Sequence, residues 1–317
     1  MSSPPLTQLL QSPEMIFLTF LMLAVVWMLR DEKDRVRVFL VLAMILNLFW
    51  GYLLTVFMDR ADGLLKWKYD YFLDRMDGAL GASSAAVALF FQGRWSVMLG
   101  VVYGCVFPMA IFWVWVNRKH RVQVLARAYV AELATIPILY AVLPGCGPAY
   151  AFGKTWTHPP AVLPEAIRLS GAPNAFPSGH LALALIFVLT ARGRLWRGVS
   201  LVFLAGTALA TLTTGQHYVI DLVAGAAFGC YLASVGNLRL RRAVAYLGVT
   251  VAWSLAIRFG VNALIAHPGV VRLFAALTVA AAMHAVWTEW RAEGSEVRGI
   301  ETIRPQAEVS LPAMPST

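Results

Sequence analysis

The stretch FPSGH, residues 176–180, stands immediately before an apolar run, residues 181–189. Ser178 is a suitable N-cap for a helix that begins there, because its side-chain oxygen can accept a hydrogen bond from a free backbone N–H group. The N-terminus of a helix attracts anions such as phosphate, and Gly179 lets an oxyanion approach the backbone closely. We therefore expect His180 to point toward a bound anionic group.

A second stretch, QHYVID at residues 216–221, opens another apolar run. His217 and Asp221 are spaced i, i+4, which places both on one face of a helix. An aspartate that accepts a hydrogen bond from one imidazole nitrogen fixes the tautomer and leaves the other nitrogen free to attack. An ionisable pair at the start of a membrane span indicates a functional site. Together the two stretches predict a site for phosphoester chemistry.

The chain as a whole has the composition of a polytopic membrane protein. Of its 317 residues, 59% are hydrophobic and 14% are charged, whereas soluble chains have roughly 45–50% apolar and about 25% charged residues. The net charge of +9 gives no argument for nucleic acid, because the basic residues cluster at helix ends, as the positive-inside rule expects. The three scattered cysteines form neither a disulfide framework nor a metal-binding spacing.

Apolar runs near the length of a membrane span, roughly 20 residues, predict an all-α helical bundle with about nine spans. We place these spans at residues 13–29, 38–58, 95–116, 128–147, 179–191, 198–215, 219–237, 243–265 and 272–289. The short apolar segment 79–93 is expected to form an interfacial or re-entrant helix.

The predicted division of the chain has three parts. Residues 1–94 hold the N-terminal spans and the interfacial segment, and residues 95–290 form the catalytic membrane domain. Residues 291–317 are polar and contain three prolines, so they are expected to form a disordered cytoplasmic tail.

The charges of the loops predict the orientation of the chain. Basic clusters follow the third, fifth and seventh predicted spans: Arg118, Lys119, Arg121 and Arg127, then Arg192, Arg194 and Arg197, then Arg239, Arg241 and Arg242. These loops are cytoplasmic by the positive-inside rule. His180, His217 and Asp221 then lie on the other side. We expect an integral protein of a bacterial inner (plasma) membrane whose active site faces the extracytoplasmic side.

Both stretches resemble signatures of the type 2 phosphatidic acid phosphatase superfamily. That superfamily carries PSGH in one signature, and a histidine with an aspartate four residues later in another. Residues 140–152, YAVLPGCGPAYAF, contain a Tyr-x-x-x-Pro-x-x-Gly-Pro run. This run is similar to the branch that contains the fungal inositol phosphorylceramide synthase, an inositolphosphotransferase. The resemblance covers residues 128–237 well, and it implies an all-helical catalytic core of the phosphatidic acid phosphatase type 2 kind.

The resemblance also implies a role for each matching residue. His217 would be the nucleophile and would form a phosphohistidine, while Asp221 would orient it and stabilise its charge. His180 would protonate the leaving group and then act as the base for the incoming acceptor. Ser178 and Gly179 would donate hydrogen bonds to the phosphoryl oxygens. Neither a metal nor a cofactor is implied.

Two departures from the superfamily concern the charge that neutralises the phosphate. The usual lysine followed seven residues later by Arg-Pro is missing, and Thr211 stands where an arginine usually precedes the third signature's histidine by six residues. The synthase-like branch also lacks that arginine, so the second departure favours the branch. Positioned cations normally stabilise phosphoryl transfer. Lys154, His158 and Arg168 are therefore candidate phosphate-binding residues, the alternative being solvated loop charges.

The stretch DRMDG, residues 74–78, matches only the opening of a CDP-alcohol phosphotransferase signature. That signature continues with Ala-Arg and needs two more aspartates nearby, whereas the next aspartate after Asp77 is Asp221. We therefore reject that function. Instead, Asp70, Asp74 and Asp77 are expected to form one polar face of an interfacial helix, beside aromatic residues of the kind enriched at that depth.

Two functions within one enzyme class stay open. Water as the acceptor gives a lipid phosphate phosphatase that acts on phosphatidate or a polyprenyl (pyro)phosphate. A lipid or alcohol acceptor gives a transferase of a phospho-headgroup, which the synthase-like motifs favour. Membrane lipids are the expected partners, and nucleic acid is not.

A proton-coupled transporter is the alternative from another class. It would use the His–Asp pair as a proton relay, and it would carry ionisable residues deep within spans and internal repeats. Most ionisable residues lie at span ends, with Glu132, Arg258 and His284 as the main exceptions, and no repeat is evident.

Overall fold

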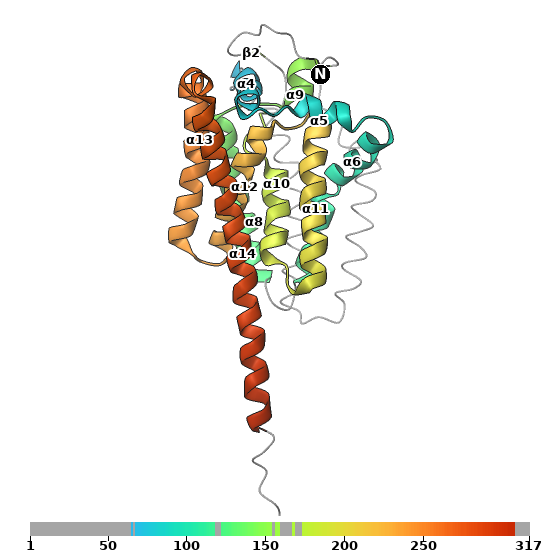
Figure 1. Cartoon of the computed structure of the whole chain (residues 1–317), viewed down its shortest axis with the longest axis vertical. Helices are drawn as coiled ribbons and strands as arrows, with labels where there is room; N and C mark the ends of the chain where they lie inside the picture. The colour runs from blue at the N-terminus through green and yellow to red at the C-terminus, as the bar shows by residue number, and fades with distance from the viewer. Residues whose placement is uncertain are drawn as a thin grey trace, which may run out of the picture.

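The chain folds into a bundle of long apolar helices (Figure 1). The computed structural model describes residues 65, 67–117, 122–153, 156–158, 167–168 and 173–307, and only the backbone of 167–168 and 293–307. The described elements are β1 (Trp67–Lys68), α4 (Asp70–Leu80), α5 (Ser84–Phe90), α6 (Arg94–Gly104), α7 (Val106–Val116), α8 (Val122–Val142), α9 (Pro148–Phe152), β2 (Ile167–Arg168), α10 (Gly179–Thr190), α11 (Gly193–Thr213), α12 (Val219–Gly236), α13 (Leu240–Ala266) and α14 (Pro268–Ala307).

Five helices of the described part are long and apolar enough to cross a membrane: α8, α11, α12, α13 and the Pro268–Ala292 part of α14. A sixth crossing is formed if α6 and α7 make one broken span, since they meet at Cys105 with a bend of 51°. Pro108 accounts for the break, because proline cannot donate to the carbonyl of Gly104 and its ring crowds that carbonyl. This pair covers the predicted span 95–116.

The predicted count of nine spans is not confirmed. The predicted spans 13–29 and 38–58 lie outside the described residues. Helix α10, predicted as the span 179–191, has 12 residues. At about 1.5 Å of rise per residue it is shorter than the roughly 30 Å of a hydrocarbon core. Segment 79–93 contains the seven-residue helix α5, which is also too short to cross.

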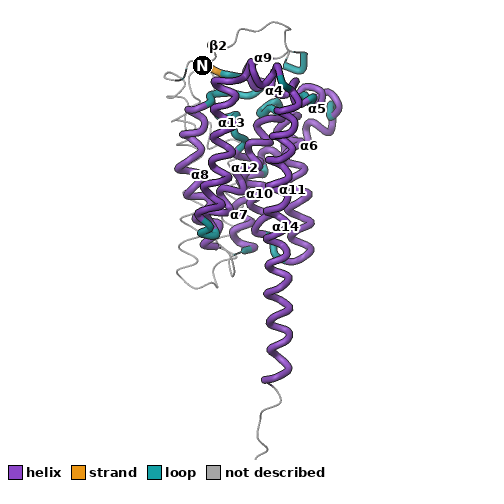
Figure 2. The backbone as a smooth tube through the Cα atoms, turned by 60° about the vertical axis from the view of Figure 1, so that its left-hand side comes forward, coloured by secondary structure: helices purple, strands orange, loops and turns teal. Residues whose placement is uncertain are grey.

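Helix α10 forms the centre of the bundle. Every residue from Leu181 to Thr190 is buried, as expected for a helix that is apolar on all sides. It packs against α12, α11, α7 and α8, and α12 in turn packs against α8 and α13 (Figure 2). The core thus encloses the two helices that carry FPSGH and QHYVID.

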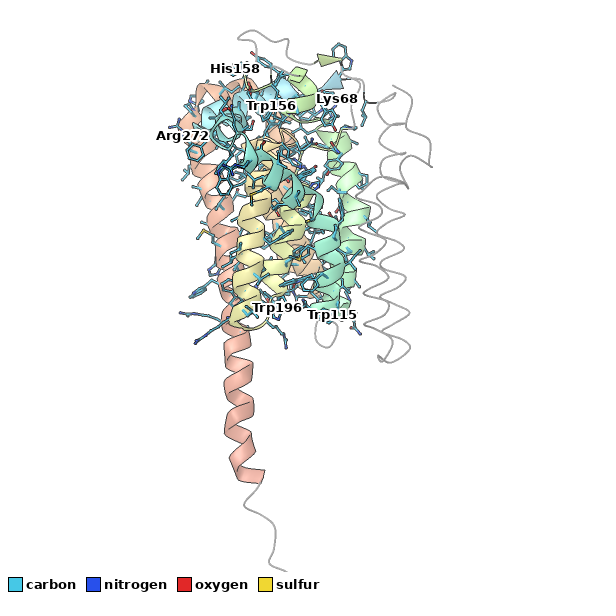
Figure 3. The ribbon with its side chains drawn as sticks, turned by 90° about the vertical axis from the view of Figure 1, so that its right-hand side faces the viewer. Lys68, Trp115, Trp156, His158, Trp196 and Arg272 are labelled. Atoms are coloured by element: carbon cyan, nitrogen blue, oxygen red, sulfur yellow. The ribbon has the colours of Figure 1, made fainter. Side chains whose placement is uncertain are left out.

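The two ends of the bundle differ in the elements that they carry. The turns with Arg192–Arg197 and Arg239–Arg242 lie at one end, together with Trp115 and Trp196 (Figure 3). At the other end lie α4, α9 and His158, beside Lys68 of the antiparallel β1–β2 ladder. Two of the loops predicted to be cytoplasmic therefore share an end.

Helix α14 is longer than the sequence predicts. It continues without a break to Ala307, whereas the composition after residue 291 predicts a disordered tail. Residues 292–307 contain glutamate and arginine, which favour helix, and also Gly294, Gly299 and Pro305, which disfavour it; a packed span can nucleate a helix that continues past its own end. The predicted domain boundaries themselves stay predictions.

Candidate active site

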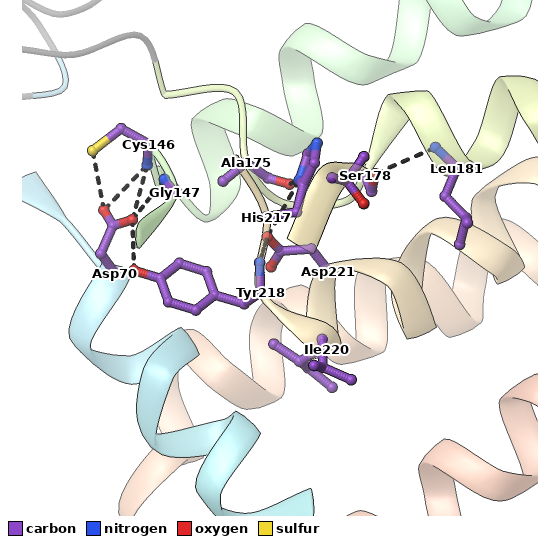
Figure 4. A network of polar contacts seen from close by, with 12 residues as sticks. Asp70, Cys146, Gly147, Ala175, Ser178, Leu181, His217, Tyr218, Ile220 and Asp221 are labelled. Atoms are coloured by element: carbon purple, nitrogen blue, oxygen red, sulfur yellow. Dashed lines mark hydrogen bonds and ion pairs between the residues drawn. The ribbon is translucent and has the colours of Figure 1, made fainter. Parts of the chain in front are cut away.

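His217 lies in the short loop between α11 and α12 and is 2% exposed. Its Nδ1 is 2.8 Å from the backbone oxygen of Ala175 (Figure 4). A carbonyl can only accept a hydrogen bond, so Nδ1 carries the proton and donates it to Ala175. In the neutral ring Nε2 then holds a free lone pair, which is the form required of a nucleophile.

Asp221 lies one turn further along, in α12, and is fully buried. Its Oδ2 is 3.4 Å from Nδ1 of His217, which is longer than an ordinary hydrogen bond. The same oxygen accepts a 2.8 Å bond from the backbone N–H of Tyr218. Ala175 therefore makes the shorter contact with the imidazole, and Asp221 places a carboxylate beside it while capping its own helix. The predicted orienting role of Asp221 stays a prediction.

His180 is the second residue of α10, and the structure brings it to His217. The two imidazole rings are 5.8 Å apart, centroid to centroid, at 64°. Tyr103 of α6 stacks on the ring of His180 at 4.2 Å, and Phe107 of α7 meets it edge-on at 5.6 Å. Both aromatic residues flank the break between α6 and α7, so this bend shapes one wall of the site.

The predicted N-cap role of Ser178 is confirmed. Its Oγ accepts a hydrogen bond of 3.3 Å from the N–H of Leu181. Its own N–H donates to the backbone oxygen of Asp221 at 3.1 Å, which ties the two stretches directly together. The N–H groups of Gly179 and His180 have no acceptor among the described residues, so they are free to bind an anion at the start of α10.

Gly179 is needed for a reason that the sequence alone does not reveal. A Cβ atom at this position would lie 2.8 Å from Cδ1 of Ile136, 3.4 Å from the hydroxyl of Tyr140 and 3.7 Å from Oε1 of Glu132. The glycine therefore allows α8 to approach the start of α10. It also brings Glu132, near the middle of α8, to the edge of the site. A carboxyl group within an apolar span is the signal that could have identified it.

Of the three candidate cations, only His158 has a described side chain, and it has no described contact with His180 or His217. His158 is exposed, and its described contact is a 3.0 Å approach of Nδ1 to Oγ1 of the adjacent Thr157. The backbone of Arg168 pairs with Trp67 in the β1–β2 ladder, and its side chain is outside the description. Lys154 lies outside the described residues. Their predicted roles in binding phosphate stay predictions.

The electrostatic environment keeps His217 neutral. Burial lowers its pKa to about 4, and the hydrogen bond to Ala175 opposes this shift. A neutral imidazole at physiological pH retains its attacking lone pair. Among the described residues, no three histidine, cysteine, aspartate or glutamate side chains are grouped to hold a metal ion.

The prediction for two of the three aspartates of α4 was wrong. Asp70 is fully buried and Asp77 is 2% exposed, so neither lies on a polar outer face; Asp74 alone is half-buried. Both accept hydrogen bonds from the loops around His217. The signal was present in the spacing, because residues 70 and 77 fall on the same helical face as the apolar Leu73.

A comparison with known families agrees with this geometry. A family model described as the PAP2 superfamily matches residues 73–235, which include both stretches and span a little over half of the chain. The chain therefore belongs to this superfamily, that of the type 2 phosphatidic acid phosphatases. Its apolar helices and this domain make it an integral membrane protein of lipid phosphoester chemistry. No curated protein and no solved structure matches the chain.

Proposed function

We propose that the chain is a phosphotransferase that forms a phosphohistidine on His217 and passes a phospho-headgroup to a lipid or alcohol acceptor. The observation that carries this proposal is the hydrogen bond from Nδ1 of His217 to Ala175. It leaves Nε2 as the free nitrogen, in a ring 5.8 Å from that of His180.

The reaction would proceed in two half-reactions. Nε2 of His217 attacks the phosphorus of the donor lipid, the P–N bond forms and the P–O bond to the leaving group breaks. His180 gives a proton to the leaving oxygen; burial and the neighbouring His217 lower its pKa to about 3, so the protonated His180 that reacts is a minor form at neutral pH. The acceptor oxygen then attacks the phosphorus, the P–N bond breaks, and the acceptor's proton returns to His180. Gly179, as predicted, and the N–H of His180 would stabilise the phosphoryl oxygens; the N–H of Ser178 is already bonded to Asp221.

A lipid phosphate phosphatase, with water as the acceptor, is the second candidate. The run at residues 140–152 and the missing arginine signature support transfer over hydrolysis, since both are similar to the synthase-like branch. The burial of His217 supports transfer as well, because a phosphohistidine there would be shielded from bulk water.

We further propose that the site opens to the extracytoplasmic side of a bacterial inner membrane. The basic turns lie at the end of the bundle opposite α4 and α9, and basic loops are cytoplasmic. The lipid substrates would then reach the histidines from the outer part of the membrane.

The test uses the purified full chain and His217→Ala in detergent, each given a labelled lipid phosphoester with and without an alcohol acceptor. We expect the wild type to release its leaving group, to carry label on the protein after rapid quenching, and to form a new phosphodiester when the alcohol is present. Free phosphate formed at the same rate with and without alcohol would identify a phosphatase instead.

Two results would contradict the proposal. Turnover that survives in His217→Ala would remove the assignment of the nucleophile. A wild type that turns over no phospholipid or polyprenyl phosphate, but moves protons across a vesicle membrane, would favour the transporter.

A further inference from the structure

We propose that α4 is the element that holds the nucleophile in place, and that Asp70 and Asp77 are positioning residues for His217. They act through two separate sets of hydrogen bonds, one to the start of α12 and one to the loop that binds the imidazole. This inference rests on the proposed function only in taking His217 as the attacking group.

The first set of bonds fixes the start of α12. The two carboxylate oxygens of Asp77 accept from the N–H groups of Val219 at 2.8 Å and Ile220 at 2.9 Å. The first N–H groups of a helix have no partner within it, and a carboxylate acceptor gives strong, charge-assisted bonds. Because α12 begins two residues after His217, a cap supplied from α4 sets both the position and the rotation of the helix that presents His217 and Asp221.

The second set reaches the imidazole itself. Asp70 accepts from the N–H of Gly147 at 2.8 Å, from the N–H of Cys146 at 3.1 Å and from the hydroxyl of Tyr218 at 3.1 Å. Gly145, the residue before Cys146, accepts a hydrogen bond of 2.8 Å at its backbone oxygen from the N–H of Ala175. Ala175 is the acceptor of the Nδ1 proton of His217. One carboxylate thus fixes the loop that sets the tautomer of the nucleophile.

The two loops around His217 are also bound to each other. The N–H of Ala149 donates to the oxygen of Gly215 at 2.8 Å. A Cβ at Gly147 would lie 2.3 Å from the oxygen of Gln216, and the φ of Gly147 is +88°. Only glycine adopts this backbone without strain and fits this contact. Asp70 therefore restrains both loops, because Gly147, which it binds, lies directly against the backbone of Gln216.

A positioning role follows from what the restrained groups do. If Ala175 moves away, Nδ1 loses its acceptor, and the imidazole proton can reside on Nε2, where the attacking lone pair is needed. A misplacement of about 1 Å at a reacting group can cost about a hundredfold in rate. Small shifts of α4 should therefore slow the formation of phosphohistidine before they weaken substrate binding.

The three aspartates of α4 provide a matched experiment. Asp70→Asn and Asp77→Asn remove a carboxylate from each set of bonds, while Asp74→Asn makes the same change on the same helix at a half-buried position with no described hydrogen bond to either loop. With a labelled lipid phosphoester, we expect the first two variants to form phosphohistidine about 10- to 100-fold more slowly, with the KM for the donor within about twofold of the wild type. Asp74→Asn should match the wild type.

A second measurement separates positioning from general stability. Nitrogen NMR of histidine-labelled protein, with the His217 signals assigned by their loss in His217→Ala, reports which ring nitrogen carries the proton. We expect the Nδ1–H form alone in the wild type and a mixture of tautomers in Asp70→Asn. Tyr218→Phe, which removes only one bond to Asp70, should shift the same signals less and slow the labelling less.

The outcomes distinguish this inference from the proposed function. Wild-type labelling rates and tautomer in Asp70→Asn and Asp77→Asn would overturn the inference while the nucleophile assignment stands. Equal losses in all three asparagine variants, or a fall in Tm with an unchanged tautomer, would also overturn it, since both indicate stability alone. A wild type that is never labelled would overturn the proposed function and this inference with it.

Discussion

At the scale of the residue, the important property of His217 is which of its nitrogens carries the proton. The sequence pairs this histidine with Asp221 by spacing, but the nearest acceptor of its Nδ1 proton is a backbone oxygen, that of Ala175. A backbone acceptor has no titration of its own. The attacking form of His217 is therefore set by the position of a loop and by burial.

This assignment predicts how labelling depends on pH. Burial lowers the pKa of His217 to about 4 from an ordinary value of 6.5. The rate of phosphohistidine formation should therefore fall on the acid side only as the pH approaches about 4. His217 binds fewer protons in the folded state than in the unfolded chain between these two values, so the Tm of the wild type relative to His217→Ala should fall as the pH is lowered from 6.5 to 4. Buried carboxyl groups with a raised pKa, such as Asp70, act in the opposite direction but contribute to both proteins. Rapid-quench labelling and thermal unfolding across this range provide the check, and an acid limb centred near 6.5 would contradict the expectation.

At the scale of the element, two glycines of α12 allow the stretches FPSGH and QHYVID to meet. A Cβ at Gly225 would lie 2.8 Å from the backbone oxygen of Ser178, and one at Gly229 would lie 3.0 Å from that of Ala182. Small residues four apart permit close approach of helices in membranes. This contact between α10 and α12 brings His180 to the ring of His217 although neither helix is amphipathic.

Gly225→Ala tests this contact. The added methyl group meets a backbone atom that cannot rotate away, so we expect a destabilisation of about 1–3 kcal/mol and slower labelling of His217. Gly248→Ala in α13 is the matched control, because nothing lies within 4 Å of its Cβ position and alanine favours helix by about 0.5–1 kcal/mol. Thermal unfolding in detergent together with the labelling rate measures both effects, and equal behaviour of the two variants would contradict the role of the contact.

At the scale of the whole molecule, the polar elements around the site lie at one end of the bundle and the basic turns lie at the other (Figure 1). Helix α10 is too short to reach both surfaces, and His180 near its start packs against Tyr103 of α6 and Phe107 of α7. An outward-facing site requires the end of the bundle with α4 and α9 to face the outside of the cell.

Accessibility of introduced cysteines tests that orientation. His158→Cys, at the end with α4 and α9, should react with a membrane-impermeant thiol reagent in intact cells. Arg194→Cys, in the first turn of α11, should react only after the membrane is opened. Labelling of the parent chain, which has three native cysteines, gives the background signal. Protection of residue 158 together with labelling of residue 194 in intact cells would show the opposite orientation.

The sequence alone determined the family, the membrane class and the residues that come together. Apolar run length and residue spacing are local properties, so FPSGH, QHYVID and the long helices could be read directly, and Ser178 caps α10 as its position predicts. The predicted count of spans is not confirmed, because a short apolar run such as that of α10 has the composition of a span without its length.

Only the tertiary structure decided how the histidine is held. The contacts of Asp70 and Asp77 join residues more than 70 positions apart, and their spacing places both on the face of Leu73 without showing which backbone groups they bind. The contact of Gly179 with Ile136 and the pairing of Nδ1 with Ala175 likewise depend on the packing of distant segments. Local spacing identifies the candidate reactive groups, whereas the tautomer and position of His217 depend on long-range hydrogen bonds that no local pattern encodes.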